Sequence, residues 1–220
     1  MLPKLVIFDL DGTLVDTAPD LCAALSHALI ALGREPVDAA VVRHLVGHGA
    51  RALLEAGLGL TGGNDEALVE AGLPLFLSHY AAHIADGSRP YDGVEATMDE
   101  LDAAGTRLAV CTNKPIALAN ALIEALGWSG RFAAVLGGDS LAVRKPDGAH
   151  VAATAEAAGA SLTDAVFVGD TAVDVAAARD ARVPVVVVAF GFAPDARVLG
   201  ADAVIDDYAE LVPLLRGLQR

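Results

Sequence analysis

The chain has 220 residues, enough for one large domain or a domain with a smaller insert, and its 54% hydrophobic content excludes a disordered protein. Lys and Arg number 15 against 29 Asp and Glu, and the net charge of −14 argues against binding to nucleic acid or to an anionic membrane surface. The two cysteines, Cys22 and Cys111, are far apart and fit a reduced protein better than a disulfide framework.

The first predicted element is a buried strand, Leu5–Phe8, which leads directly into the segment Asp9-Leu10-Asp11-Gly12-Thr13. Side chains two residues apart on extended backbone point the same way, so Asp9 and Asp11 should face one site. At the carboxyl end of a strand, where α/β sheets bind ligands, such a pair suggests a nucleophile and an acid–base catalyst. A calcium loop is rejected, because Ala18 stands where that loop needs a glutamate. An ordinary Asp-Gly turn stays as the alternative.

The next part of the chain, from about residue 17 to residue 85, contains no convincing strand. A first helix begins at Asp16 or Thr17, carries leucines at helical spacing and ends at Gly33. Further helices are expected over Asp38–Val46, Ala50–Ala56 and Asp65–Ile84, with a flexible turn over Gly57–Gly63. A helical insert at this point would lie above the Asp9–Asp11 pair, in the position of a lid.

From about Arg89 onward, short apolar runs alternate with segments of helical length. The runs are Leu108–Cys111, Ala133–Leu136, Val166–Val168, Val185–Val188 and Ala203–Ile205, and the helical segments include Val94–Ala104, Ile116–Leu126 and Gly148–Ala158. Such alternation predicts a parallel sheet with helices on its faces. We therefore predict an α/β fold in which residues 1–15 and 87–220 form a Rossmann-like core domain. Residues 16–86 would form a small helical cap domain, inserted after the first strand.

Three later segments add polar side chains at or beyond predicted strand ends. Thr112 precedes a helix, where a hydroxyl group suits a phosphate oxygen. Lys145, one of three lysines in the chain, could neutralise a phosphoryl group or a carboxylate. Asp170 and Asp174 are spaced to converge at a helix start, and carboxylates suit Mg²⁺. Each segment has an ordinary alternative, a helix cap or a solvated loop charge, but four of them in this order favour phosphate and Mg²⁺ chemistry.

In these segments the chain resembles the haloacid dehalogenase superfamily of phosphatases, whose four motifs match Asp9-Leu10-Asp11-Gly12-Thr13, Thr112, Lys145 and Gly169-Asp170…Asp174. The resemblance implies that Asp9 forms an aspartyl-phosphate and that Asp11 is first the general acid and then the general base. It implies Mg²⁺ held by Asp9, the Asp11 carbonyl and Asp170, with Asp174 nearby. It also implies that Thr112 and Lys145 bind the phosphoryl group, and the substrate site is expected to include Gly12 and Asn113.

Within the superfamily, the chain is most similar to bacterial phosphoglycolate phosphatases, in the segments Asp16–Asp20, Val46–Ala50, Arg89–Val94 and Thr112–Pro115. This resemblance implies hydrolysis of 2-phosphoglycolate to glycolate. Asp11 argues against a dehalogenase, which has no alcohol to protonate. The absence of lysine from residues 16–86 argues against phosphonoacetaldehyde hydrolases, which use a cap lysine. His48 and Arg51 are candidate ligands of the substrate carboxylate, the alternative being a turn histidine and a solvated arginine.

Other functions stay open at this point. The same core and cap could serve a phosphatase for N-acetylmuramic acid 6-phosphate, pyrophosphate or a nucleotide, or a sugar phosphomutase. A non-catalytic binding protein is a remote alternative. We expect a small phosphorylated metabolite as partner, no nucleic acid or membrane, and a monomer or homodimer. No signal segment or membrane span is evident, so we expect a cytoplasmic location.

Overall fold

The computed structural model describes every residue except 64, 219 and 220. Within the described residues, six strands form one parallel sheet, in the order β5 (Ala134–Leu136), β4 (Arg107–Cys111), β1 (Leu5–Phe8), β6 (Ala165–Gly169), β7 (Val185–Val188) and β8 (Ala203–Ile205). The inner strands β1, β6 and β7 are buried along their whole length, as their continuous apolar runs require. The predicted parallel sheet is confirmed.

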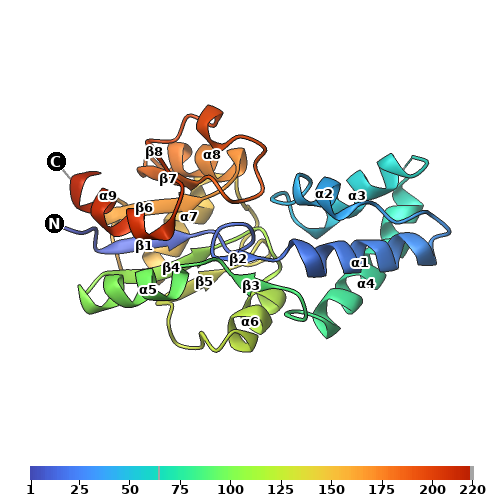
Figure 1. Ribbon diagram of the computed structural model, residues 1–220, viewed down its shortest axis with the longest axis horizontal. Helices are drawn as coiled ribbons and strands as arrows, with labels where there is room; N and C mark the ends of the chain where they lie inside the picture. The colour runs from blue at the N-terminus through green and yellow to red at the C-terminus, as the bar shows by residue number, and fades with distance from the viewer. Residues whose placement is uncertain (64, 219–220) are drawn as a thin grey trace.

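Helices cover both faces of this sheet (Figure 1). On one face lie α5 (Val94–Ala103), α6 (Ile116–Ala125) and α9 (Leu211–Leu218), and on the other α7 (Gly148–Ala157) and α8 (Ala172–Asp180). Alternate residues of each strand point to opposite faces of the sheet, so Phe8 packs against the first group of helices and Ile7 against the second. Each large apolar side chain buried in this way stabilises the fold by about 1.5–3 kcal/mol.

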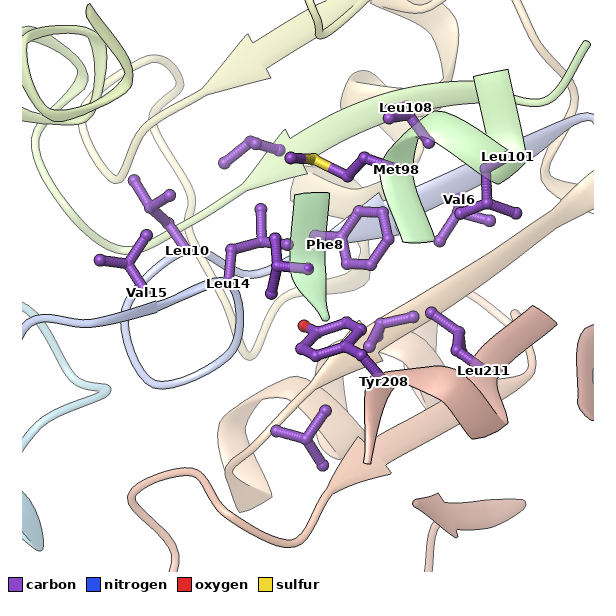
Figure 2. Close-up of a cluster of buried hydrophobic side chains, with 14 of the residues drawn as sticks. Val6, Phe8, Leu10, Leu14, Val15, Met98, Leu101, Leu108, Tyr208 and Leu211 are labelled. Carbon is purple, nitrogen blue, oxygen red and sulfur yellow. The ribbon is translucent and has the colours of Figure 1, made fainter. Parts of the chain in front are cut away.

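The segment that follows β1 is anchored in the first of these hydrophobic clusters. Figure 2 shows Leu10, Leu14 and Val15 in the cluster with Phe8 and Tyr208. The three aliphatic side chains are fully buried. Tyr208 Oη also donates a hydrogen bond of 2.8 Å to the carbonyl oxygen of residue 13. Buried apolar side chains before and after the polar residues of the loop that follows β1 therefore hold this loop in place.

A separate group of helices lies beside the sheet (Figure 1), and consists of α1 (Ala18–Ala31), α2 (Ala39–Arg43), α3 (Ala50–Leu60) and α4 (Glu66–Ala82). These helices enclose a hydrophobic cluster of their own, with Leu25, Leu54 and Phe76 fully buried. The helical periodicity of the sequence predicts all of them, although α2 is shorter than the expected Asp38–Val46. Apolar packing within the group stabilises helices that are too short to be stable alone.

The predicted flexible turn over Gly57–Gly63 is wrong in its first half, because α3 continues to Leu60. Leu58 is fully buried in the helical cluster. A Cβ atom on Gly57 would lie 2.8 Å from Leu25 Cδ1, so glycine lets α3 approach α1 closely. Tertiary packing here outweighs the low helix propensity of glycine.

A short antiparallel ribbon, β2 (Val15–Asp16) paired with β3 (Arg89–Pro90), was not predicted. The chain passes from the sheet to the helical group through β2 and returns through β3, so one ribbon holds both connections. Arg43 of α2 forms an ion pair with Asp16 and ties the helices to this ribbon. Short 3₁₀ helices lie at Leu162–Asp164, Ala196–Val198 and Tyr208–Glu210. Among the described residues, no helix has the length and apolar character needed to cross a membrane.

Candidate active site

Three motif residues meet at the carboxyl edge of the sheet because their strands are neighbours. Strand β1 pairs with β4 on one side and β6 on the other, and its last residue is level with Val110 and Val168. The chain beyond these positions leads to Asp9, Thr112 and Asp170, which lie at the same edge. All three residues are buried, with at most 5% of their surface exposed.

The loop after β1 directs two carboxylates toward a pocket while the residue between them faces the core. Asp9 and Asp11 both line the pocket, whereas Leu10 is fully buried among apolar side chains. Gly12 has a φ of +80°, and a Cβ atom at this position would lie 2.3 Å from Asp170 Oδ2. Both the backbone conformation and the close contact therefore require glycine.

The carboxylates of Asp9, Asp170 and Asp174 form a buried cluster in which one oxygen of each lies within 4.8 Å of the others. Asp170 is fixed by hydrogen bonds from Thr13 Oγ1 (2.9 Å) and from the backbone N–H of Phe192 (2.8 Å). Burial and the neighbouring carboxylates raise the pKa of Asp170 above its ordinary value and that of Asp9 to about 6. A hard divalent cation fits this donor set, because it prefers oxygen ligands and offsets the repulsion between them.

Lys145 is the counter-ion of this cluster. Its Nζ lies 2.9 Å from Asp9 Oδ1 and 2.7 Å from Asp174 Oδ1, and its side chain is 1% exposed. Burial opposes the charge, but Asp174 and Asp9 raise the pKa of Lys145 above its ordinary value, so the amine stays protonated. The other Asp174 oxygen accepts hydrogen bonds from the Thr171 hydroxyl and from the backbone N–H groups of Asp170 and Thr171. Asp174 therefore fixes both Lys145 and the start of α8.

Thr112 and Asn113 begin the loop after β4, and both line the pocket. Asn113 Nδ2 donates hydrogen bonds to the carbonyl oxygens of Gly47 (3.1 Å) and Lys145 (3.0 Å). Asn113 thus connects the helical group to the loop that carries Lys145. The binding of phosphate by Thr112 and Asn113 stays a prediction.

Lys114 and Tyr80 belong to the same site but were not selected by the sequence motifs. Lys114 Nζ donates hydrogen bonds to Asp11 Oδ1 (2.9 Å) and to Tyr80 Oη (2.5 Å), and its side chain is 2% exposed. Tyr80 belongs to α4, so this contact joins the helical group to Asp11. The sequence held one signal for Lys114, its position two residues after Thr112 in a chain with three lysines, and none for Tyr80.

A pocket extends from Asp9 and Asp11 between the sheet edge and the helices α1, α3 and α4. The predicted carboxylate ligands His48 and Arg51 are not among the described residues that line it. His48 is exposed, and Arg51 forms ion pairs with Glu55, Glu66 and Glu70. The structure therefore brings the core motif residues together and leaves these two outside the pocket. A contact of either residue with substrate stays a prediction.

Without a bound cation, the protein is expected to be less stable at neutral pH than at mildly acidic pH. The pKa of Asp9 is about 6 in the folded protein, above the ordinary 3.8, so the folded form binds this proton more tightly than the unfolded chain. Ionisation of Asp9 therefore lowers the free energy of unfolding as the pH rises through this window. In EDTA, the Tm should increase when the pH is lowered from about 7.5 to about 5.5, and Mg²⁺ should raise the Tm more at the higher pH.

The variant Asp9→Asn serves as the control for this effect, because it lacks the titrating carboxylate. Its Tm in EDTA should depend less on pH over the same window than that of the unmodified protein. An equal pH dependence in the two proteins would show that Asp9 does not cause the effect.

Comparisons with known proteins show which family the chain resembles. A family model for haloacid dehalogenase-like hydrolases matches residues 3–182. A phosphoglycolate phosphatase from Agrobacterium fabrum is 46% identical over 219 residues, covering 97% of this chain and 93% of the relative. One from Rhodospirillum rubrum is 44% identical, with 96% and 90% covered. The crystal structure of a predicted phosphoglycolate phosphatase from Haemophilus somnus 129PT is similar at a TM-score of 0.90 and 30% identity, covering 96% of this chain and 97% of that one.

Proposed function

Because the chain belongs to the haloacid dehalogenase-like hydrolases and is a phosphoric monoester hydrolase, we propose that it dephosphorylates 2-phosphoglycolate to glycolate with Mg²⁺ as its cofactor. The observation that carries the proposal is the buried group of Asp9, Lys145 and Asp170, in which Asp9 also lines the pocket. The substrate is supported by the name shared by relatives that are 46% and 44% identical over nearly the whole chain.

Asp9 is the proposed nucleophile. Its Oδ1 accepts hydrogen bonds from the backbone N–H of Leu10 (2.7 Å) and is paired with Lys145 (2.9 Å), so Oδ2 is the proposed attacking atom. Attack forms a bond between Oδ2 and phosphorus and breaks the bond between phosphorus and the ester oxygen. Water then hydrolyses the aspartyl-phosphate and regenerates the carboxylate.

Asp11 is the proposed acid–base catalyst. It lies two residues beyond Asp9, lines the same pocket and is held by Lys114 at 2.9 Å. In the first step it gives a proton to the ester oxygen, so that this oxygen leaves as a hydroxyl group and not as an alkoxide. In the second step it takes a proton from the attacking water, which restores the starting state.

The phosphoryl oxygens are proposed to contact Lys145 and Thr112, which are both buried at the sheet edge. Lys145 is the cation nearest the nucleophile and would offset the charge that develops on these oxygens. Asp9, Asp170 and the backbone carbonyl of Asp11 would hold Mg²⁺, with Asp174 orienting Lys145. When bound, this cation would neutralise phosphoryl charge in an acidic protein.

We also propose that residues 16–86 form a cap domain over a core of residues 1–15 and 87–220. Support comes from the hydrophobic cluster formed mainly by α1–α4, which Leu118 of α6 joins, and from the β2–β3 ribbon at the two chain crossings. A closed cap would exclude water while the reaction proceeds. A cytoplasmic location and a monomeric or homodimeric state stay predictions.

Phosphate release from a panel of phosphorylated compounds tests the proposed function. The panel contains 2-phosphoglycolate, N-acetylmuramic acid 6-phosphate, pyrophosphate, nucleoside monophosphates and hexose phosphates. We expect kcat/KM to be highest for 2-phosphoglycolate, the substrate named for the relatives that are 46% and 44% identical. We also expect EDTA to abolish turnover and Mg²⁺ to restore it.

The other outcomes of this panel separate the alternatives. A metal-dependent activity that is highest on another ester would keep the mechanism and reject the proposed substrate. Turnover that persists in EDTA would show that the reaction does not require Mg²⁺. No turnover on any ester would favour a phosphomutase or a binding protein.

A further inference from the structure

We propose that Lys114 binds the carboxylate of the substrate and so sets the preference of this site for an acidic leaving group. This inference rests on the proposed function and deepens it, because it names the group that distinguishes 2-phosphoglycolate from a neutral phosphate ester. It assigns to Lys114 the role that the sequence resemblance suggested for His48 and Arg51.

The position of Lys114 relative to Asp11 carries the inference. Lys114 Nζ lies 2.9 Å from Asp11 Oδ1, and Asp11 is the residue that faces the leaving oxygen in the proposed reaction. In 2-phosphoglycolate the carboxylate is attached to the same carbon that bears this oxygen. The carboxylate of a bound substrate must therefore lie next to Asp11, within reach of the Lys114 ammonium.

The rest of the pocket offers no second cation for this carboxylate. Among the described residues that line the pocket, Lys114 is the one positively charged side chain. The wall beyond it is apolar and is formed by Leu21, Val46, Leu53, Phe76 and Leu118. A carboxylate directed against this wall would be buried without a partner, which is strongly unfavourable.

The surroundings of Arg51 support the same assignment. Its guanidinium group is paired with Glu55, Glu66 and Glu70 at 3.0, 2.6 and 2.8 Å, respectively. Contact with a substrate would require these ion pairs to break and the side chain to leave the surface of the helical group. Lys114 needs no such movement, because its ammonium already lies in the pocket.

Tyr80 makes this carboxylate site depend on the helical group. The Lys114 ammonium donates a hydrogen bond to Tyr80 Oη and lies 4.2 Å from the centroid of the Tyr80 ring. Both contacts, together with the ion pair to Asp11, fix the position of the ammonium in the pocket. Because Tyr80 is on α4 and Lys114 is on the loop after β4, the site is complete only when α4 is packed against the core.

The test compares two substrates that differ in the carboxylate, 2-phosphoglycolate and ethyl phosphate. The variant Lys114→Met removes the charge but keeps an unbranched side chain. Both esters should react more slowly with it, because Asp11 loses a hydrogen-bond partner. The additional loss in kcat/KM for 2-phosphoglycolate should be about 30-fold, the effect expected for a lost hydrogen bond to a charged group.

Two further variants complete the experiment. Lys4→Met is the matched control, since Lys4 is one of the three lysines and its side chain is 77% exposed in an ion pair with Asp164. It should leave the ratio of the two kcat/KM values unchanged. If Lys114→Met does not fold, Lys114→Gln replaces it, because glutamine keeps a hydrogen-bond donor toward Asp11 without the charge.

Each outcome decides one question. If the unmodified enzyme prefers 2-phosphoglycolate and the Lys114 variant loses that preference, the inference is supported. If the variant slows both esters by the same factor, Lys114 acts only through Asp11 and the inference is wrong, although the substrate is right. If the unmodified enzyme itself does not prefer 2-phosphoglycolate to ethyl phosphate, the proposed function is wrong.

Discussion

Replacement of Asp9 by asparagine is expected to lower kcat for phosphate release by roughly 10⁴-fold or more, because the amide cannot form the covalent intermediate. The fold should persist. Lys145 keeps its ion pair with Asp174 at 2.7 Å, and the buried cluster loses one of its mutually repelling charges. Phosphate release should be measured with 2-phosphoglycolate at saturating Mg²⁺, and the Tm of the variant should be at least that of the unmodified protein in EDTA.

The matched control for this variant is Asp164→Asn. Asp164 precedes β6 at the opposite edge of the sheet from Asp9, and its side chain is 38% exposed. This change should leave kcat within a factor of about two, since an exposed ion pair contributes little. Brief reaction followed by acid quench and hydroxylamine should trap an acyl-phosphate in the unmodified enzyme but not in Asp9→Asn. Substantial turnover by Asp9→Asn would exclude Asp9 as the nucleophile.

Replacement of Asp11 by asparagine should have an effect that depends on the leaving group. With 2-phosphoglycolate, whose alkoxide leaves poorly without a proton, kcat should fall by roughly 10²–10⁴-fold. With p-nitrophenyl phosphate, formation of the aspartyl-phosphate should be nearly normal, because nitrophenolate is a good leaving group. The hydrolysis of this intermediate should still be slow, since Asp11 is also the proposed base that activates water.

The two steps can be separated by rapid mixing with p-nitrophenyl phosphate. The Asp11→Asn variant should release one equivalent of nitrophenolate per site in a burst, followed by a slow steady rate. Equal loss of activity on both esters, without a burst, would contradict the assignment of Asp11 as general acid. Lys114 is unchanged in this variant, so the asparagine at position 11 still lies beside the Lys114 ammonium.

The sequence allowed much of the core site to be predicted because that site is built from strand ends. Asp9, Thr112 and Asp170 each follow a short apolar run, and neighbouring parallel strands bring such positions together without further information. The pairing of Lys145 with Asp9 and Asp174 is less direct, because a loop separates Lys145 from β5. The sequence indicates that Lys145 could neutralise a phosphoryl group or a carboxylate, but it does not identify Asp9 and Asp174 as the partners.

The contacts between the helical group and the core could not be predicted in this way. Tyr80 and Lys114 are 34 residues apart, and nothing in helical spacing indicates which residue of α4 meets the loop after β4. Arg51 is a candidate ligand of the substrate carboxylate in the sequence, yet glutamates of α3 and α4 surround it. Its local sequence does not contain Glu66 and Glu70, which reach it only after the helices pack.

The ribbon of β2 and β3 was missed for a related reason. Each strand has two residues, too few to produce an alternating pattern, and its partner lies more than 70 residues away in sequence. The extension of α3 through Gly57 also depends on a partner, since the close approach of Leu25 explains the glycine. In each case a tertiary contact decides the local structure.

The pairing of β1 has a consequence for the order in which the molecule can assemble during its synthesis. The ribosome makes β1 first, but its neighbours β4 and β6 begin at Arg107 and Ala165. The helices α1–α4 contact one another over a much shorter stretch and can pack while the later strands are still being translated. A nascent chain therefore carries Asp9 for most of its elongation without Lys145, Asp170 or Asp174, and it can form the complete buried charge cluster only after residue 174 has emerged.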